Sequence, residues 1–192
     1  MKKIITISRQ FGSGGREIGE LVGKKLNIPV YDKYIIENVA KQSGFESKLV
    51  KIALDDNSMS KYASKRFKIN GTNVDELLYI EEKRIINELA SKESCIFIGR
   101  CSDYILKDNP EAMHVFIYAD NEHRLERIKN GDYEGNDKPN IILEEKDKKR
   151  AINYSHFTNR EWGNKDNYDL MINSSRLSIE DCANIIIELF KK

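Results

Sequence analysis

Cysteine is scarce in this chain, and its spacing does not suit a metal site. The sequence has three cysteines, Cys95, Cys101 and Cys182, which is an odd number without zinc-motif spacing. Cys95 and Cys182 lie in apolar stretches, where we expect buried, reduced thiols of a cytoplasmic protein. The three histidines are scattered and fit neither a metal cluster nor a nucleophile pattern. No metal ligated by protein side chains is predicted.

Long apolar runs and a strong net charge are missing as well. Lys and Arg number 32 against 31 Asp and Glu, a formal net charge of +1, which gives no general attraction to nucleic acid or anionic lipid. No apolar run approaches the roughly 20 residues that span a bilayer. The opening "MKKIITIS" lacks a cleavage site and is more typical of a buried strand than of a signal peptide. We expect neither nucleic acid nor membrane as a partner, and the oligomeric state stays open.

What the chain does contain is an alternation of short apolar strands with helices. With 33% charged and 40% hydrophobic residues among 192, it suits one domain over 1–192. Strands are expected at 4–8, 30–32, 95–99, 114–119 and 168–173. Helices are expected at 16–26, 34–41, 74–90, 122–130 (capped by Asn121), 141–157 and 179–190 (capped by Ser178). The polar segment 42–72 resembles a mobile insertion. The alternation predicts a parallel α/β sheet with helices on both faces.

Unusual residues gather where these strands end. They are the glycine-rich segment 8–15, Asp32, the Gly99-Arg100 pair and the residues after Ala119. Ligands of parallel α/β sheets bind beyond the carboxyl ends of the strands. The sequence therefore predicts a ligand site at this edge.

The segment "SRQFGSGGREIG" has the composition of a loop that binds phosphate through backbone N–H groups at a helix start. A structural turn is the simpler alternative. A dinucleotide loop would use Gly12, Gly14 and Asp32, but Glu17 stands where its third glycine belongs. A triphosphate loop, G-x-x-x-x-G-K-[ST], fits better if Gly14 is its last glycine.

That alignment puts Gly15 at the lysine and Arg16 at the hydroxyl position. We expect the missing positive charge to be displaced onto Arg16, whose guanidinium suits phosphate. Alternatively, Arg16 points outward and bridges the helix. The nucleotide-binding segment is predicted to comprise Phe11, Gly12, Ser13, Gly14, Gly15, Arg16 and Glu17.

Six segments together resemble the cytidylate kinase-like proteins, relatives of bacterial cytidylate kinases among the P-loop nucleoside monophosphate kinases. The segments are "ITISRQFGSGGREIG", "IPVYDK", "CIFIGRCSDYIL", "HVFIYADNEHRLERI", "DKKRAINY" and "NYDLMINSS". The resemblance covers nearly the whole chain outside 42–72. It implies a P-loop NTPase fold with a five-stranded parallel sheet, a substrate-side helical region (33–90) and a lid (about 121–163). ATP would lie in the glycine loop, and the acceptor near "YDK" and "GRCSD".

Two departures from the family pattern leave the acceptor open. Gly15 replaces the loop lysine, and "GRC" replaces the G-R-D that helps recognise the base, with Asp103 two positions later. Cytidylate is therefore not assigned as the substrate.

Phosphoryl transfer needs converging positive charge more than a nucleophile. The predicted catalytic residues are Arg16, Arg100 and Arg150. The predicted acceptor-binding residues are Asp32, Lys33, Arg100 and Asp103. Simpler roles stay open: Arg100 could pair with a carboxylate such as Asp32 or Asp103, and Arg150 could lie on a solvated helix face. Salt bridges would equally explain Arg124 and Arg127.

The sequence thus predicts an ATP- and Mg²⁺-dependent phosphotransferase acting on a nucleoside monophosphate or a similar small molecule. Because the loop hydroxyl is absent, the nucleotide and water would supply most of the ligands of the magnesium ion. A nucleotide-binding regulatory protein that has lost catalysis is the alternative. A nicotinamide-dependent oxidoreductase is a third.

Overall fold

The computed structural model describes residues 3–32, 68–69, 72–130 and 139–192. Its centre is a five-stranded sheet in the order β2-β5-β1-β6-β7, in which every pair of neighbours is parallel. The strands are β1 (Ile4–Arg9), β2 (Val30–Tyr31), β5 (Cys95–Ile98), β6 (Ala112–Tyr118) and β7 (Leu170–Asn173). The predicted parallel sheet is confirmed, with all five strands close to their expected positions.

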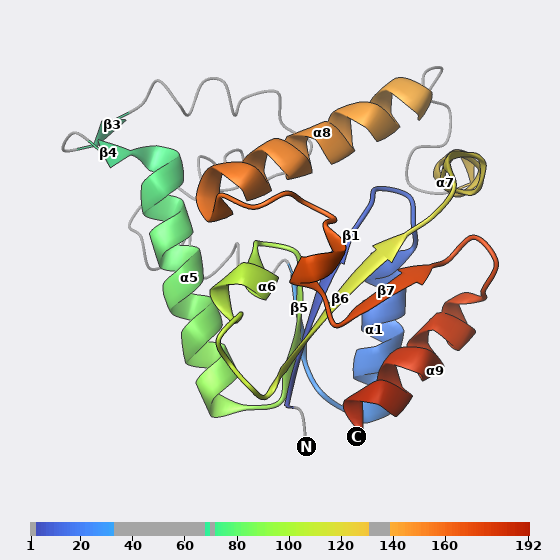
Figure 1. The fold of residues 1–192 in the computed structure, drawn as a ribbon, viewed down its shortest axis with the longest axis horizontal. Coiled ribbons are helices and arrows are strands. Elements are labelled where there is room, and N and C mark those ends of the chain that lie inside the picture. Colours follow the sequence, from blue (N-terminus) through green and yellow to red (C-terminus); the bar gives the residue numbers. More distant parts are fainter. Residues whose placement is uncertain (1–2, 33–67, 70–71, 131–138) are drawn as a thin grey trace.

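Helices cover both faces of the sheet (Figure 1). On one face, α1 (Gly15–Leu26) and α9 (Ile179–Phe190) bury an apolar cluster that includes Ile5, Ile7 and Ile96. On the other face, α5 (Val74–Lys92) packs on Ile4 and Phe97. Alternate residues of each strand face opposite sides of the sheet, which is why the strands are mostly apolar.

Three further helices surround the carboxyl ends of the strands. They are α6 (Ser102–Ile105), α7 (Asn121–Lys129) and α8 (Pro139–Thr158). In Figure 1, α8 runs across this edge from the side of α5 toward α7. The short strands β3 (Lys68–Ile69) and β4 (Thr72–Asn73) form an antiparallel pair before α5, and a 3-10 turn spans Lys165–Asn167.

Two helix caps test the sequence predictions directly. Ser178 caps α9 as predicted, in a reciprocal arrangement with Asp181. The predicted cap at Asn121 is wrong: Asp120 is the cap residue, with extended backbone, and Asn121 is already helical. Asn121 Oδ1 instead accepts a hydrogen bond of 2.6 Å from Arg124. The expected helix 34–41 and most of segment 42–72 lie outside the described residues.

The boundaries of the substrate-side region (33–90) and of the lid (about 121–163) stay predictions. The described part of the substrate-side region is mainly α5, and the described part of the lid consists mainly of α7 and α8. No helix among the described residues is long and apolar enough to cross a membrane. Cys95, Cys101 and Cys182 are buried and form no disulfide, and burial raises the pKa of Cys95 to about 12.

Candidate functional site

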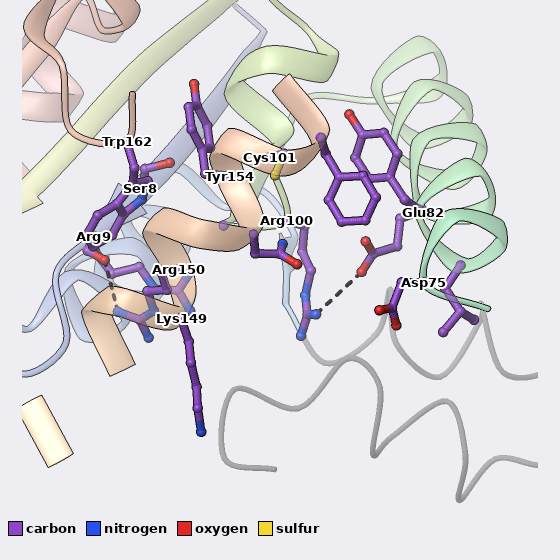
Figure 2. A pocket seen from close by; sticks show the side chains of 15 residues that line it. Ser8, Arg9, Asp75, Glu82, Arg100, Cys101, Lys149, Arg150, Tyr154 and Trp162 are labelled. Atoms are coloured by element: carbon purple, nitrogen blue, oxygen red, sulfur yellow. Dashed lines mark hydrogen bonds and ion pairs between the residues drawn. The ribbon is translucent and has the colours of Figure 1, made fainter. Parts of the chain in front are cut away.

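A pocket lies at the carboxyl ends of β1 and β5, between α5 and α8 (Figure 2). Its charged lining consists of the cations Arg9, Arg100, Lys149 and Arg150 and the acids Asp75 and Glu82. Its aromatic lining consists of Tyr79, Tyr154, Phe157 and Trp162. The cations outnumber the acids, so this edge of the sheet suits an anionic ligand.

The glycine loop joins β1 to α1 beside this pocket. Gly12 and Gly14 have φ values of +78° and +77°, which side chains rarely adopt. Ser13 is fully buried, and its hydroxyl donates to Gln10 O at 2.9 Å. Ser174 Oγ donates to Ser13 O at 2.8 Å. The tight loop is therefore held in shape by its own buried polar side chain and by the end of β7.

Several backbone N–H groups of the loop remain available. Among the described residues, none accepts a hydrogen bond from the N–H of Gly12, Gly14 or Gly15. These amides stand at the start of α1, where the helix dipole also favours negative charge. Together they have the chemistry of an anion site.

One loop amide is taken by α8. Phe11 N donates to Asp147 Oδ1 at 2.7 Å, and Arg124 NH1 donates both to Phe11 O, at 3.2 Å, and to Asp147. Arg124 is buried, and this ion pair fits the structural alternative for it. Arg127 likewise pairs with Glu17 at 2.7 Å, and the two side chains are 33% and 60% exposed. These contacts join α7 and α8 to the loop.

Arg150 reaches from α8 to the end of β1. Its NH1 donates to Arg9 O at 2.9 Å, and its guanidinium lies 5.7 Å from the centre of the Phe11 ring. The side chain is largely buried. A solvated helix face is therefore excluded for Arg150, which lines the pocket.

Arg100 follows β5 in a left-handed turn. Gly99, Arg100 and Cys101 have φ values of +72°, +61° and +51°. Arg100 NH1 lies 3.4 Å from Glu82 Oε1, and the two side chains are only 15% and 8% exposed. Among the described residues Arg100 therefore does form an ion pair with a carboxylate, but the acid is Glu82 and not Asp32 or Asp103. Sequence reasoning missed Glu82, although an acid on the same helical face as Leu78 and Ile86 was a usable signal.

Asp103 is not among the residues that line the pocket. It is 2% exposed and accepts hydrogen bonds from Ser8 Oγ, at 3.3 Å, and Tyr154 OH, at 2.6 Å. Burial raises the pKa of Asp103, although the two hydrogen bonds oppose this shift. Burial and the neighbouring Asp103 likewise raise the pKa of Tyr154. In this arrangement Asp103 connects α6, β1 and α8.

Arg16 and Asp32 lie apart from the pocket lining. Arg16 Nε and NH2 donate to Asp32 Oδ2 at 2.9 and 2.5 Å, and the Arg16 side chain is 48% exposed. The structure therefore brings Arg100 and Arg150 together in one pocket and pairs Arg16 with Asp32 elsewhere. Lys33 lies outside the described residues.

The comparisons with known proteins agree with one another on the fold. A cytidylate kinase from Methanobrevibacter smithii is 25% identical over 189 residues, covering 98% of each chain. The crystal structure of an uncharacterized protein from Eubacterium ventriosum has a TM-score of 0.76 at 25% identity, covering 100% of this chain and 99% of that one. A shikimate kinase from Bacteroides thetaiotaomicron has a TM-score of 0.58 at 14% identity and 98% coverage of both, which supports the fold alone.

The five-stranded parallel sheet of this chain, flanked by helices, thus has P-loop kinase-like structural neighbours. The model of the cytidylate kinase-like family matches residues 4–176, which is most of the chain. The chain belongs to the cytidylate kinase-like family.

Proposed function

We propose that this protein transfers the terminal phosphoryl group of ATP to a small-molecule acceptor, with nucleoside monophosphates as the first candidate class. The observation that carries the proposal is the convergence of Arg100 and Arg150 on one pocket beside a glycine loop with available amides. Phosphoryl transfer depends on such positioning and charge neutralisation.

The loop fits a polyphosphate. The available N–H groups of Gly12, Gly14 and Gly15 can donate hydrogen bonds to an anion. The positive end of the α1 dipole also attracts negative charge, so both favour the phosphate tail of ATP. Magnesium, when bound, neutralises charge on the nucleotide oxygens. Because Arg16 stands at the usual hydroxyl position, the nucleotide and water would supply most of its ligands.

The far side of the pocket suits the organic part of an acceptor. Tyr79 and Phe157 form a flat stack with centroids 4.2 Å apart, and Asp75 and Glu82 provide carboxylates beside it. Figure 2 shows these acids on the side of α5, across from Arg9 and Arg150. A phosphate at the arginines and a ring with amino or hydroxyl groups near the acids would satisfy both halves.

A coupled ADP-release assay tests the function. Purified protein is given ATP–Mg²⁺ with each of CMP, dCMP, UMP, AMP and GMP. We expect ADP release that depends on one or more acceptors and on magnesium. Arg84→Ala, which removes an exposed arginine of α5 that pairs with Glu81 and Glu88, is the matched control and should keep the wild-type rate.

The regulatory alternative is favoured by the loop itself, in which Gly15 and Arg16 replace the lysine and the hydroxyl. Measurable ATP binding without turnover on any acceptor would favour that alternative. Magnesium-independent NADH binding in place of ATP binding would instead favour the oxidoreductase.

A further inference from the structure

Two departures from the triphosphate loop stand at opposite ends of the pattern. With Gly14 as the last glycine of G-x-x-x-x-G-K-[ST], Arg9 occupies the first glycine position and Gly15 occupies the lysine position. An arginine thus replaces a glycine, and a glycine replaces the lysine, within seven residues. The pair has the form of an exchange.

The structure gives this exchange a steric basis. A Cβ atom on Gly15 would lie 2.6 Å from Arg9 Cβ and 3.0 Å from Arg9 Cγ, at or inside the closest approach that real Cβ atoms make. Arg9 Cβ cannot swing away, because it is attached to the backbone of β1, where Arg9 is paired with Ile117 of β6. A side chain at position 9 and a side chain at position 15 therefore exclude each other.

The guanidinium of Arg9 extends to a second glycine. A Cβ atom on Gly99 would lie 2.1 Å from Arg9 NH1, so the charged end lies against the turn that follows β5. This turn carries Arg100, and the carbonyl of Arg9 accepts the hydrogen bond from Arg150. Arg9, Arg100 and Arg150 line the same pocket, as Figure 2 shows.

We infer that Arg9 supplies the positive charge that the loop lysine supplies elsewhere, with Gly15 and Gly99 making room for it. The inference rests on the proposed function and names a residue that the sequence patterns did not single out. In the reaction, an acceptor phosphate oxygen bonds to the terminal phosphorus while the bond to ADP breaks, and ADP keeps the electron pair. Arg9 contacts the oxygens of the transferred group and exchanges no proton, because guanidinium stays charged.

The first test compares single arginine variants. Arg9→Ala should lower kcat/KM about 100-fold or more, with Arg9→Lys recovering part of the loss. Arg84→Ala on exposed α5 should stay at the wild-type value, and Arg16→Ala should lose much less than Arg9→Ala. Melting curves establish that each variant is folded. An Arg9→Ala rate within about threefold of wild type, or a larger loss in Arg16→Ala, would overturn the inference.

The second test restores the ordinary pattern and does not depend on Arg9→Ala being well folded. Gly15→Lys alone should lower the melting temperature by about 5 °C or more, because the new side chain meets Arg9. In the Arg9→Gly background the same change should be tolerated and should raise kcat/KM about tenfold over Arg9→Gly. Equal and additive effects in both backgrounds would contradict the steric exchange.

A binding measurement separates this inference from the proposed function. Calorimetry with tripolyphosphate and with ATP–Mg²⁺ is run on wild type and Arg9→Ala. If wild type binds both ligands but shows no turnover, the kinase proposal fails. In that case an affinity for these ligands that is at least about tenfold weaker in Arg9→Ala still supports the Arg9 inference. If wild type shows turnover and Arg9→Ala has the same affinity and kcat/KM as wild type, only the Arg9 inference fails. Absence of both binding and turnover in wild type defeats both.

Discussion

Two arginine–carboxylate pairs near the strand ends differ in their neighbours and in how far their arginines are exposed. Arg100 and Glu82 lie in the pocket between α5 and α8, with side chains 15% and 8% exposed. Arg16 and Asp32 lie outside it, with side chains 48% and 12% exposed, so this pair is open to solvent on the Arg16 side only. The outer pair has the shorter contact, 2.5 Å against 3.4 Å. Distance alone therefore does not predict which arginine is catalytic, whereas burial and neighbouring cations favour Arg100.

Of the substitutions in these two pairs, Arg100→Ala is expected to have the largest effect on activity. Arg100→Ala should lower kcat/KM by about 10²–10³-fold, as removal of one charge-stabilising donor does. It also leaves Glu82 buried without this partner, which should cost about 1–3 kcal/mol of the free energy of unfolding. Coupled kinetics and urea denaturation measure the two effects separately.

A double variant separates catalysis from the ion pair. Arg100→Ala/Glu82→Gln removes the uncompensated charge and should recover stability without recovering turnover. If instead the rate per folded molecule returns with stability, Arg100 serves only the pair with Glu82.

The inner region also contains a buried acid whose effect depends on pH. Burial raises the pKa of Asp103 in the folded protein, while the unfolded chain keeps an ordinary value near 3.9. Between these two values the folded state binds more protons, so its stability falls as pH rises. Asp103→Asn should therefore gain stability relative to wild type with increasing pH, by at most about 1.4 kcal/mol per pH unit.

Urea denaturation at several pH values from about 4 upward measures this difference. The matched control is Asp108→Asn, which removes one exposed carboxylate next to Lys107. A constant difference between Asp103→Asn and wild type over the series would contradict a raised pKa.

The sheet and its helices were predictable because each depends on local periodicity and on a few caps, such as Ser178. The location of the site was predictable in outline, since parallel strands end at one edge. The family resemblance, which the matching family model confirms, added the kinase-like fold, which the similar solved structures support. Of the predicted site residues, Arg100 and Arg150 line one pocket; their catalytic roles stay predictions.

Pairings across the fold could not be predicted from spacing. Asp147 reaches Phe11 over 136 positions, and Tyr154 reaches Asp103 over 51; both contacts depend on how α8 crosses the strand ends. Arg9 was not predicted as a site residue, because loop patterns are aligned on glycines. Its close contacts with Gly15 and Gly99 can be seen only in the folded structure. The sequence pattern instead favoured Arg16, the next cation along the chain.

The smallest effect is expected at that outer pair. Arg16→Ala removes an exposed contact with Asp32, and such pairs contribute about 0–1 kcal/mol, less at high salt. Its free energy of unfolding should thus differ little from wild type and should converge with it at about 0.5 M NaCl. Asp32→Asn should produce the same small change, and the double variant should add nothing further. A fall of tenfold or more in ATP affinity for Arg16→Ala would mean that Arg16 leaves Asp32 to bind phosphate. The displaced charge would then be on the outer side of α1, and the contrast between the two pairs would not hold.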